Sequence, residues 1–390
     1  MKVYLVGGAV RDALLGLPVK DRDWVVVGAT PEDMLAAGYK QVGADFPVFL
    51  HPDTREEYAL ARTERKQGHG YHGFTVYSAP DVTLEEDLQR RDLTINAMAQ
   101  SVDGEVVDPF GGRADLEARL LRHVSPAFEE DPLRILRTAR FAARFAPMGF
   151  AVAEETMELM RGMVEQGEVD HLVAERVWQE TRRALHEQAP RVYFEVLREC
   201  GALAVVMPEV DGLMEYPEGG AVAAVAAPTG GMSPVGRLER ACALSEDTPV
   251  RYAALIAGLD DESRDQLNER LKVPNDCKSL PAVAESIRRE LAGEPELTAE
   301  RIRDLIDAGD GWRRPERFAQ LLIVLQASGI SQASTDLLEK AREAASQVDP
   351  QQLMAAGYKG KALGEAIQGE RLKRIEREVA GCRLQVAGSR

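Results

Sequence analysis

The chain has no run of about 18 uninterrupted apolar residues, the length that a membrane-spanning helix needs. Its first residues, MKVYLVGG, lack the apolar stretch and small-residue cleavage site of a secretory signal peptide. Only four cysteines occur, and no two form a CxxC pair, so neither a thiolate zinc site nor a disulfide framework is indicated. We therefore expect a soluble, cytoplasmic protein with no membrane contact and with cysteines packed as small hydrophobic residues.

Histidine is also scarce, and basic residues are outnumbered by acidic ones. All six histidines lie in the first half of the chain, the last at His186. Lys and Arg number 48 against 64 Asp and Glu, which gives a formal charge of -16. This balance argues against nonspecific coating of nucleic acid, but it does not exclude a local basic groove. Hydrophobic residues make up 45% of 390 positions, enough for packed cores in two to four domains.

The two parts of the chain differ in hydrophobic period, which predicts an α+β protein. Near the N-terminus, short β-branched runs alternate with turn residues, so we expect a small mixed sheet of about five strands with helices. From Asp131 onward helical spacing dominates. The Gly- and aromatic-rich stretch between Lys66 and Ala79 is interpreted as a mobile loop. The Gly/Ala/Pro-rich stretch from Asp211 to Pro234 is interpreted as a loop or domain boundary.

The sharpest motif is Gly7-Gly8-Ala9-Val10-Arg11-Asp12 after the first strand, followed by Asp21-Arg22-Asp23 at the next. Two glycines let the backbone approach a phosphate, and Arg11 can add charge-assisted hydrogen bonds. Two carboxylates spaced by two residues on a strand share a face and suit Mg²⁺, which prefers hard oxygen ligands. Each feature alone is commonly an ordinary turn. Together, in this order, they predict nucleotidyl transfer.

Two further motifs are weaker. Arg90-Arg91-Asp92 places an arginine pair before LTINA; such a pair can hold a triphosphate or ribose, or can simply be solvated. The run from Asp108 to Asp115, with Gly111-Gly112 at its centre, is interpreted as a structural turn rather than a ligand site.

The helix expected after Asp131 carries Arg134, Arg137, Arg140 and Arg144 at spacings of three, three and four. This spacing places four guanidinium groups on one helix face. Like charges on one face repel, so we expect an anionic group against this stripe; a solvated face is the default alternative.

In this order, GGAVRD, the Asp21/Asp23 pair, RRDLTINA, DPFGG and EDPLRILR resemble the class II bacterial CCA-adding enzymes, a branch of the poly(A) polymerase superfamily. The resemblance is close over about residues 1–200 and diffuse beyond. It implies a catalytic nucleotidyltransferase head over residues 1–128. A helical neck that recognises the base would follow over 129–210, and a helical body and tail that bind tRNA over 211–390.

The resemblance also implies an activity and site residues. The enzyme would add C, C and A to the 3′ end of tRNA from CTP and ATP by two-metal nucleotidyl transfer, releasing pyrophosphate. Asp21 and Asp23 would be catalytic and would hold Mg²⁺, with Glu57 a candidate third carboxylate. The residues implied to bind the nucleotide are Gly8, Arg11, Arg91, Asp131, Arg134, Arg137 and Arg140, of which Asp131 and Arg134 would read the base edge. The loop between Lys66 and Ala79 would assist the change from C to A.

The sequence departs from many long relatives in lacking a His-Asp phosphohydrolase motif. Ala257 and Gly258 stand where His and Asp would be, and neither can ligate a metal. We predict that the phosphatase and cyclic phosphodiesterase activities of those relatives are absent. A basic cluster near the C-terminus suits RNA phosphates, although a solvated helix end fits it equally well; its members are Arg371, Lys373, Arg374, Arg377 and Arg383.

Two other functions compete with CCA addition. A poly(A) polymerase shares most of these motifs, but the long basic C-terminal tail expected of one is absent here. A non-enzymatic RNA-binding module is disfavoured by the intact Asp21/Asp23 pair. Oligomeric state is left open by the sequence.

Overall fold

The computed structural model describes residues 1–42, 48–66, 74–215, 232–292 and 297–387. Contacts within the chain divide it into two compact units, Met1–Val206 and Met207–Arg390. The division expected between residues 128 and 129 lies inside the first unit and stays a prediction. Most of the stretch expected to form a boundary, residues 216–231, lies outside the described residues.

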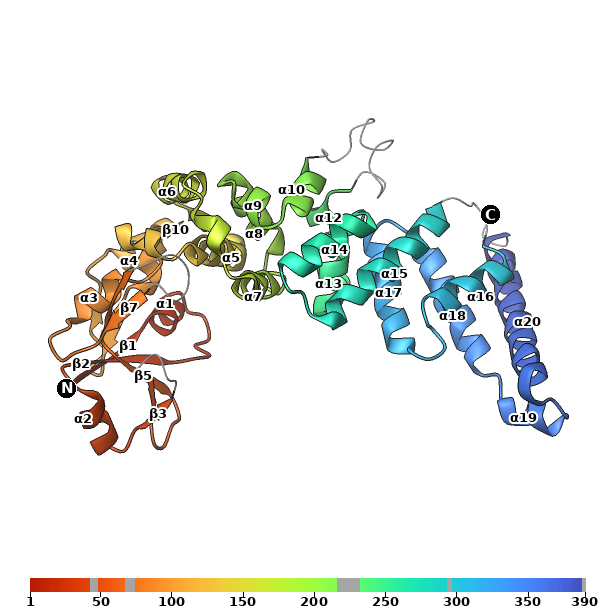
Figure 1. Ribbon diagram of the computed structural model, residues 1–390, viewed down its shortest axis with the longest axis horizontal. Helices are drawn as coiled ribbons and strands as arrows, with labels where there is room; N and C mark the ends of the chain where they lie inside the picture. The colour runs from red at the N-terminus through yellow and green to blue at the C-terminus, as the bar shows by residue number, and fades with distance from the viewer. Residues whose placement is uncertain (43–47, 67–73, 216–231, 293–296, 388–390) are drawn as a thin grey trace. The chain divides into compact units, whose positions relative to one another are not determined.

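The first unit is built on a mixed sheet of seven strands in the order β3-β4-β5-β2-β1-β8-β9 (Figure 1). The β2–β5 pair is parallel, and every other neighbouring pair is antiparallel. The strands are β1 (Lys2–Val6), β2 (Asp23–Val27), β3 (Lys40–Val42), β4 (Val48–Leu50), β5 (Glu57–Leu60), β8 (Ala99–Ser101) and β9 (Val106–Val107). The α+β class is confirmed, and the expected sheet of about five strands is extended by short strands that are hard to recognise in sequence.

The two faces of this sheet bury different side chains. One face packs Val6 and Val25 with Leu88, and the other packs Val26 with Met34 and Phe49. Because side chains alternate along a strand, Asp23 shares the face of Val25. Each face is therefore covered, and only the strand ends are left to carry polar chemistry.

The predicted loop between Lys66 and Ala79 is wrong in part. Phe74–Tyr77 form β7, which pairs antiparallel with β6 (Thr63–Lys66) as a separate hairpin. A Gly-rich context hid the β-branched and aromatic FTVY segment. Residues 67–73 of this expected loop lie outside the described residues.

The first unit also contains helices, which lie both between its strands along the chain and after them. Short strands β10 (Leu120–Leu121) and β11 (Ala151–Val152) form a parallel pair between them. The helices are α1 (Gly8–Leu14), α2 (Pro31–Ala36), α3 (Leu84–Gln89), α4 (Gly112–Ala118), α5 (Leu133–Phe145), α6 (Glu154–Glu165), α7 (Ala174–Ala184), α8 (Pro190–Glu199) and α9 (Ala202–Val206). Between them lie the 3₁₀ turns η2 (Thr94–Asn96), η3 (Pro126–Glu130), η4 (Ala146–Met148) and η5 (Glu168–His171). α5 packs against both α7 and α8.

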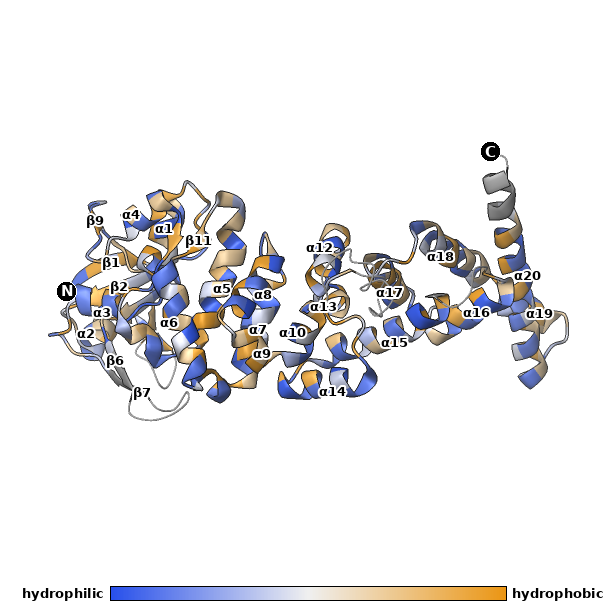
Figure 2. Cartoon of the chain, turned by 90° about the horizontal axis from the view of Figure 1, so that it is seen from above, coloured by the Kyte–Doolittle hydropathy of each residue, from blue (hydrophilic) through white to orange (hydrophobic). Residues whose placement is uncertain are grey.

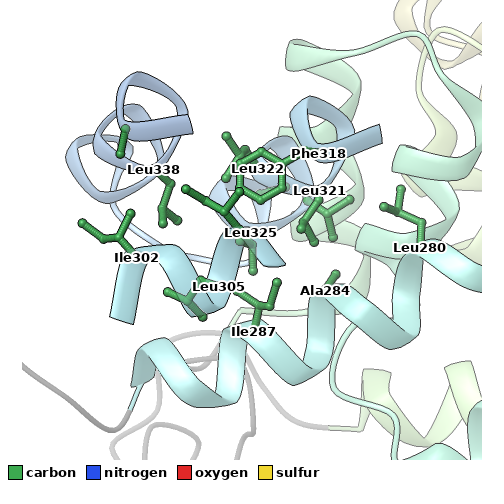
Figure 3. Close-up of a cluster of buried hydrophobic side chains, with 14 of the residues drawn as sticks. Leu280, Ala284, Ile287, Ile302, Leu305, Phe318, Leu321, Leu322, Leu325 and Leu338 are labelled. Atoms are coloured by element: carbon green, nitrogen blue, oxygen red, sulfur yellow. The ribbon is translucent and has the colours of Figure 1, made fainter. Parts of the chain in front are cut away.

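The second unit is helical throughout its described residues. Its helices are α10 (Pro208–Met214), α12 (Pro234–Leu244), α13 (Thr248–Leu255), α14 (Asp261–Arg270), α15 (Asn275–Ala292), α16 (Ala299–Ala308), α17 (Pro315–Ala327), α18 (Gln332–Ser346), α19 (Pro350–Ala355) and α20 (Gly360–Ala387). Hydrophobic and hydrophilic residues alternate around them (Figure 2). Leucine, isoleucine and phenylalanine side chains of α15, α16, α17 and α18 meet in one buried cluster (Figure 3). None of the helices in the described ranges is long and apolar enough to cross a membrane.

The C-terminal basic cluster is partly used in packing. The Arg371 guanidinium lies 4.2 Å from the centre of the Trp312 ring, and Arg374 Nη1 donates to the Ala344 carbonyl at 3.2 Å. Lys373 Nζ pairs with Glu370 at 2.7 Å, and Arg377 is exposed. The side chain of Arg383 lies outside the described residues. Arg371 and Arg374 therefore stabilise α20, which leaves Lys373 and Arg377 as the exposed described members.

Candidate active site

Strand pairing brings the Gly7-Gly8 turn and the aspartate pair together. Val6, the last residue of β1, is opposite Asp23, the first residue of β2, so the turn that follows Val6 lies at the sheet edge where Asp23 begins. Gly7 has a φ of +68°, which a side chain rarely adopts. A Cβ there would also lie 2.9 Å from Arg91 Nη1. Glycine is therefore required for the turn and for the close approach of this guanidinium.

Asp21 and Asp23 line the same cavity, but strand alternation does not explain why. β2 begins at Asp23, so Asp21 precedes the strand and is placed by the connection before it. Desolvation raises the pKa of Asp23, while Arg91 lowers it and Asp21 raises it. The two carboxylates therefore lie near enough to repel each other, and a bound divalent cation would relieve that repulsion.

The donor set fits Mg²⁺ in number. Magnesium is commonly held by one or two carboxylates together with substrate phosphates rather than by a cage of protein ligands. The register of β2 and β5 places Glu57 directly beside Asp23. Within the described ranges, however, no three His, Cys, Asp or Glu side chains form a group that could hold a metal ion. The third carboxylate proposed at Glu57 therefore does not complete a three-residue site.

All nine predicted site residues line one cavity of about 630 Å³. Its wall carries ten basic and five acidic side chains, a formal excess of five positive charges on a chain with a net charge of -16. The basic ones are Arg11, Lys20, Arg90, Arg91, Arg134, Arg137, Arg140, Arg144, Arg176 and Arg183, and the acidic ones are Asp12, Asp21, Asp23, Asp92 and Asp131. The local basic groove that the overall charge left open is therefore present.

Arg11 is held firmly at the cavity wall. Its Nε donates to Asp12 Oδ1 at 2.8 Å and its Nη1 to Asn96 Oδ1 at 2.5 Å. Its guanidinium also lies 5.2 Å and 5.0 Å from the ring centres of Phe141 and Phe145 on α5. Burial lowers the pKa of Arg11, an effect that Asp12 opposes. A rigid, partly desolvated guanidinium is suited to binding an anion with little loss of side-chain entropy.

Arg90 and Arg91 share a buried partner, the Asp87 carboxylate. Arg90 Nη2 donates to Asp87 Oδ1 at 2.8 Å, and Arg91 Nη2 donates to Asp87 Oδ2 at 3.2 Å. Burial by itself raises the pKa of Asp87, but the two guanidinium groups lower it overall. Both arginines nevertheless line the cavity, so the motif is neither a free phosphate fork nor a solvated pair.

The stripe on α5 lies against anionic and carbonyl groups of the protein itself. Arg137 Nε donates to Asp92 Oδ2 at 2.8 Å, and Arg140 Nε donates to Glu180 Oε2 at 2.6 Å. Arg144 Nη2 donates to Asp12 Oδ2 at 2.8 Å. The anionic counterpart that the charge repulsion predicts is thus supplied first by carboxylates of α1, α7 and the Asp92 segment. The default of a solvated face is wrong, because Arg134 and Arg140 are buried.

Asp131 and Arg134, the predicted base-reading pair, are each held by other groups of the protein. Asp131 Oδ2 accepts from Arg176 Nη2 at 2.8 Å, and Asp131 Oδ1 caps the backbone N–H of Leu133 at 3.1 Å. Arg134 donates to the carbonyls of Ala127 and Arg90 at 2.5 Å and 2.6 Å. Each side chain is therefore fixed by its own partners on the cavity wall.

Sequence reasoning missed cavity residues contributed by α7. Arg176 and Arg183 are seven residues apart and therefore lie on one face of the helix, with Glu180 between them. The helical spacing of these charged residues is visible in AERVWQETRRALHE, but nothing in the sequence indicates which face of the helix points to the cavity. Lys20 was also missed, although it immediately precedes Asp21.

The Asp108 to Asp115 run is confirmed as structural. Asp108 accepts from the backbone N–H groups of Gly112 and Arg113 at 2.7 Å and 2.9 Å, which caps α4. A Cβ at Gly112 would lie 2.3 Å from the Thr94 carbonyl oxygen, so glycine allows α4 to pack on η2. This packing supports the segment that carries Asp92 and Asn96.

Comparison with known proteins identifies the class of the enzyme. Residues 3–122 match the family model of the poly(A) polymerase head domain. Residues 149–214 match the model described as "Probable RNA and SrmB- binding site of polymerase A". The fold and the site thus define an enzyme of the nucleotidyltransferase class.

A curated relative places the chain more narrowly. The CCA-adding enzyme of Marinobacter nauticus is 56% identical over 380 residues, which cover 96% of this chain and 98% of the relative. The chain therefore belongs to the family of CCA-adding enzymes.

Solved structures agree in fold. The Bacillus stearothermophilus CCA-adding enzyme in complex with CTP matches at 23% identity and a TM-score of 0.65, covering 99% of this chain and 94% of that one. The Thermotoga maritima CCA-adding enzyme complexed with tRNA matches at 22% identity and a TM-score of 0.66, covering 99% and 91%.

Proposed function

We propose that this enzyme adds C, C and A in turn to the 3′ end of tRNA, using CTP and ATP and releasing pyrophosphate. One observation carries the proposal: motifs separated by more than 100 residues, at Gly8, at Asp21 and Asp23, at Arg91 and along α5, line a single cationic cavity in the described part of the chain. The 56% identity to a CCA-adding enzyme favours a CCA end over a poly(A) tail as the product.

Asp21 and Asp23 are the proposed Mg²⁺ ligands. The ion would lower the pKa of the tRNA 3′-hydroxyl and neutralise charge on the phosphates when bound. The protein's own contribution is the placement of two carboxylates in the cavity that the Gly7-Gly8 turn also lines. Two-metal participation, in which a second ion assists the departing pyrophosphate, is part of the proposal.

The cationic wall is proposed to bind the nucleotide's phosphates and sugar through Arg11, Arg91, Arg137 and Arg140, with Gly8 giving the backbone access. A Cβ at Gly8 would lie 3.3 Å from Arg11 Nη2, so glycine keeps that guanidinium close to the turn. Because these arginines are already oriented by Asp12, Asp87, Asp92 and Glu180, they would bind a triphosphate with little reorganisation.

Asp131 and Arg134 are proposed to read the base edge. A carboxylate accepts from the exocyclic amino group of C or A, whereas U and G present a carbonyl at that position and leave it unpaired. Arg176 holds the Asp131 carboxylate and so sets the orientation in which it meets the base. Because tRNA and both nucleotides are cytoplasmic substrates, we propose that the enzyme acts in the cytoplasm.

The test is incubation of pure protein with Mg²⁺ and a tRNA transcript that lacks CCA, with products resolved at single-nucleotide resolution. Two additions from CTP alone, and three followed by a stop when ATP is also present, are expected. A long ladder from ATP alone would establish a poly(A) polymerase instead. No extension under any condition would support the RNA-binding module.

A further inference from the structure

Asn96 is a buried side chain that lines the cationic cavity. Only 6% of its surface is exposed, and it lies at the end of η2. Its Oδ1 accepts from Arg11 Nη1 at 2.5 Å, and its Nδ2 donates to Asp92 Oδ1 at 3.0 Å. Its backbone carbonyl also accepts from Arg91 Nη1 at 3.5 Å. One residue thus contacts two of the cavity arginines directly.

A third arginine is reached through Asp92. The second oxygen of that carboxylate, Oδ2, accepts from Arg137 Nε at 2.8 Å, while Oδ1 accepts from Asn96 and from the Leu93 backbone N–H. The hydrogen-bonded chain therefore runs from Arg11 on α1, through Asn96 and Asp92, to Arg137 on α5. All of these groups line the one cavity.

We propose that Asn96 is a positioning residue for nucleotide binding, which fixes the guanidinium groups of Arg11, Arg91 and Arg137 in one arrangement complementary to a triphosphate. The inference rests on the proposed function of the cavity and adds a residue that acts through these three arginines. Its role is to hold three binding groups that come from separate segments of the chain.

The chemistry of the site requires an amide. Arg11 presents only donors, so its partner must accept, and Asp92 is an acceptor when ionised, so its partner must donate. An amide side chain supplies one acceptor and two donors on a single planar group. Aspartate has nearly the same shape but only accepts. Its carboxylate would face that of Asp92 at about 3 Å, the present Asn96 to Asp92 distance.

The charges facing Asn96 explain how such a change would reach the nucleotide. Arg11 contacts Asn96 from α1 and is itself paired with Asp12. Arg91 and Asp92 contact it from its own segment, and Arg137 on α5 is paired with Asp92. A carboxylate at this position would bind Arg11 more tightly and repel Asp92. It would thereby draw the Arg11 guanidinium away from the cavity. By repelling Asp92, it would also weaken the support that Asp92 gives to Arg137.

The experiment compares wild type with Asn96→Asp, which keeps the shape but replaces the donor by a charged acceptor, and with Asn96→Ser, which is neutral and too short to join both partners. KM is measured separately for CTP, ATP and tRNA, with CTP binding measured by calorimetry. We expect KM for CTP and ATP, and the Kd of CTP, to rise about tenfold in both variants, the usual cost of losing a hydrogen bond to a charged group. KM for tRNA should stay unchanged.

Asn268 offers the matched control, because it is also buried, at 4% exposure, and accepts from Tyr252 Oη at 2.8 Å in the second unit. Asn268→Asp places the same new charge at a buried position that does not line the cavity. It should lower the Tm without changing KM for CTP. If the Asn96 variants bind CTP as wild type does, or weaken tRNA and CTP equally, Asn96 is only structural and the inference is overturned. Loss of tRNA extension in wild type with CTP binding intact would instead contradict the proposed function.

Discussion

Arg176 Nη2 donates to Asp131 Oδ2 at 2.8 Å, so a residue of α7 holds the carboxylate that precedes α5. Neither side chain is fully exposed, at 27% for Arg176 and 20% for Asp131. A carboxylate that is restrained from one side presents its remaining lone pairs in a fixed direction. Specificity for the base would then depend on α7 as well as on α5.

Arg176→Gln should therefore weaken base selection. Without the guanidinium, Asp131 can turn away from the base edge, and we expect the preference for CTP and ATP over UTP and GTP to fall about tenfold. Ratios of kcat/KM for the four nucleotides measure this. Arg182→Gln is the matched control, because Arg182 is exposed on the same helix and does not line the cavity. Equal selectivity in the two variants would contradict the assignment.

Asp21→Ala and Asp23→Asn should each lower incorporation at least about a hundredfold, because each removes a proposed metal ligand. Folding should be retained. Desolvation raises the pKa of Asp23, so the charged form is not favoured by its surroundings, and its neutral replacement should leave the Tm unchanged or slightly higher. Gel assays and thermal unfolding give the two readouts. Asp53→Asn, at an exposed turn, should change neither; substantial activity in Asp23→Asn would refute the metal-ligand role.

Lys20 is the one cation of the cavity with no hydrogen bond or ion pair in the described part of the chain. A phosphate can bind it without breaking an existing pair. We expect Lys20→Ala to raise KM for either the nucleotide or tRNA about threefold to tenfold, with a weaker dependence of that KM on salt. Kinetics at two salt concentrations identify the substrate. Lys40→Ala, an exposed lysine of β3 outside the cavity, should leave both values and their salt dependence unchanged.

Arg237 is buried at 1% exposure in the second unit and donates to the Ala254 and Ala257 carbonyls at 3.1 Å and 2.7 Å. The Ala254 carbonyl lies in the last turn of α13 and the Ala257 carbonyl just beyond it, in the segment where the resemblance places the His-Asp pair of longer relatives. Arg237→Met should lower the free energy of unfolding by about 2 to 4 kcal/mol, because buried acceptors lose their donor. Urea unfolding checks this. Arg240→Met, at an exposed site on the same helix, should change it by less than about 0.5 kcal/mol.

Acid should weaken the first unit through Asp92. Burial by itself raises the pKa of Asp92, but Arg137 and the Asn96 amide lower it well below its usual value of 3.8. A carboxylate whose pKa is depressed by folding stabilises the fold above its unfolded pKa and loses that contribution as pH falls below it. The free energy of unfolding should therefore decline below about pH 4. In Asp92→Asn the decline, followed by urea titrations at successive pH values, should be shallower.

Local chemistry let much of the fold be predicted. The Thr30-Pro31-Glu32-Asp33 segment alone predicts the start of α2, and a capping box at Thr30 and Asp33 begins that helix, since such residues satisfy a helix N-terminus whatever surrounds it. β3, with only three residues, and β7, inside a Gly-rich stretch, were missed. Such short strands are stabilised by their pairing partners rather than by their own composition.

The sequence by itself determined which residues are candidates for the chemistry, because a Gly-Gly turn, paired aspartates and an arginine stripe are defined by residue type and spacing alone. Tertiary structure decided which of them face one another. Whether Arg137 meets Asp92, or Arg176 meets Asp131, depends on how α5 and α7 pack, and the sequence separation of 45 residues in each pair carries no local signal. Packing also decided that the arginine stripe would be neutralised by the protein, because a buried guanidinium without a partner is too costly to persist.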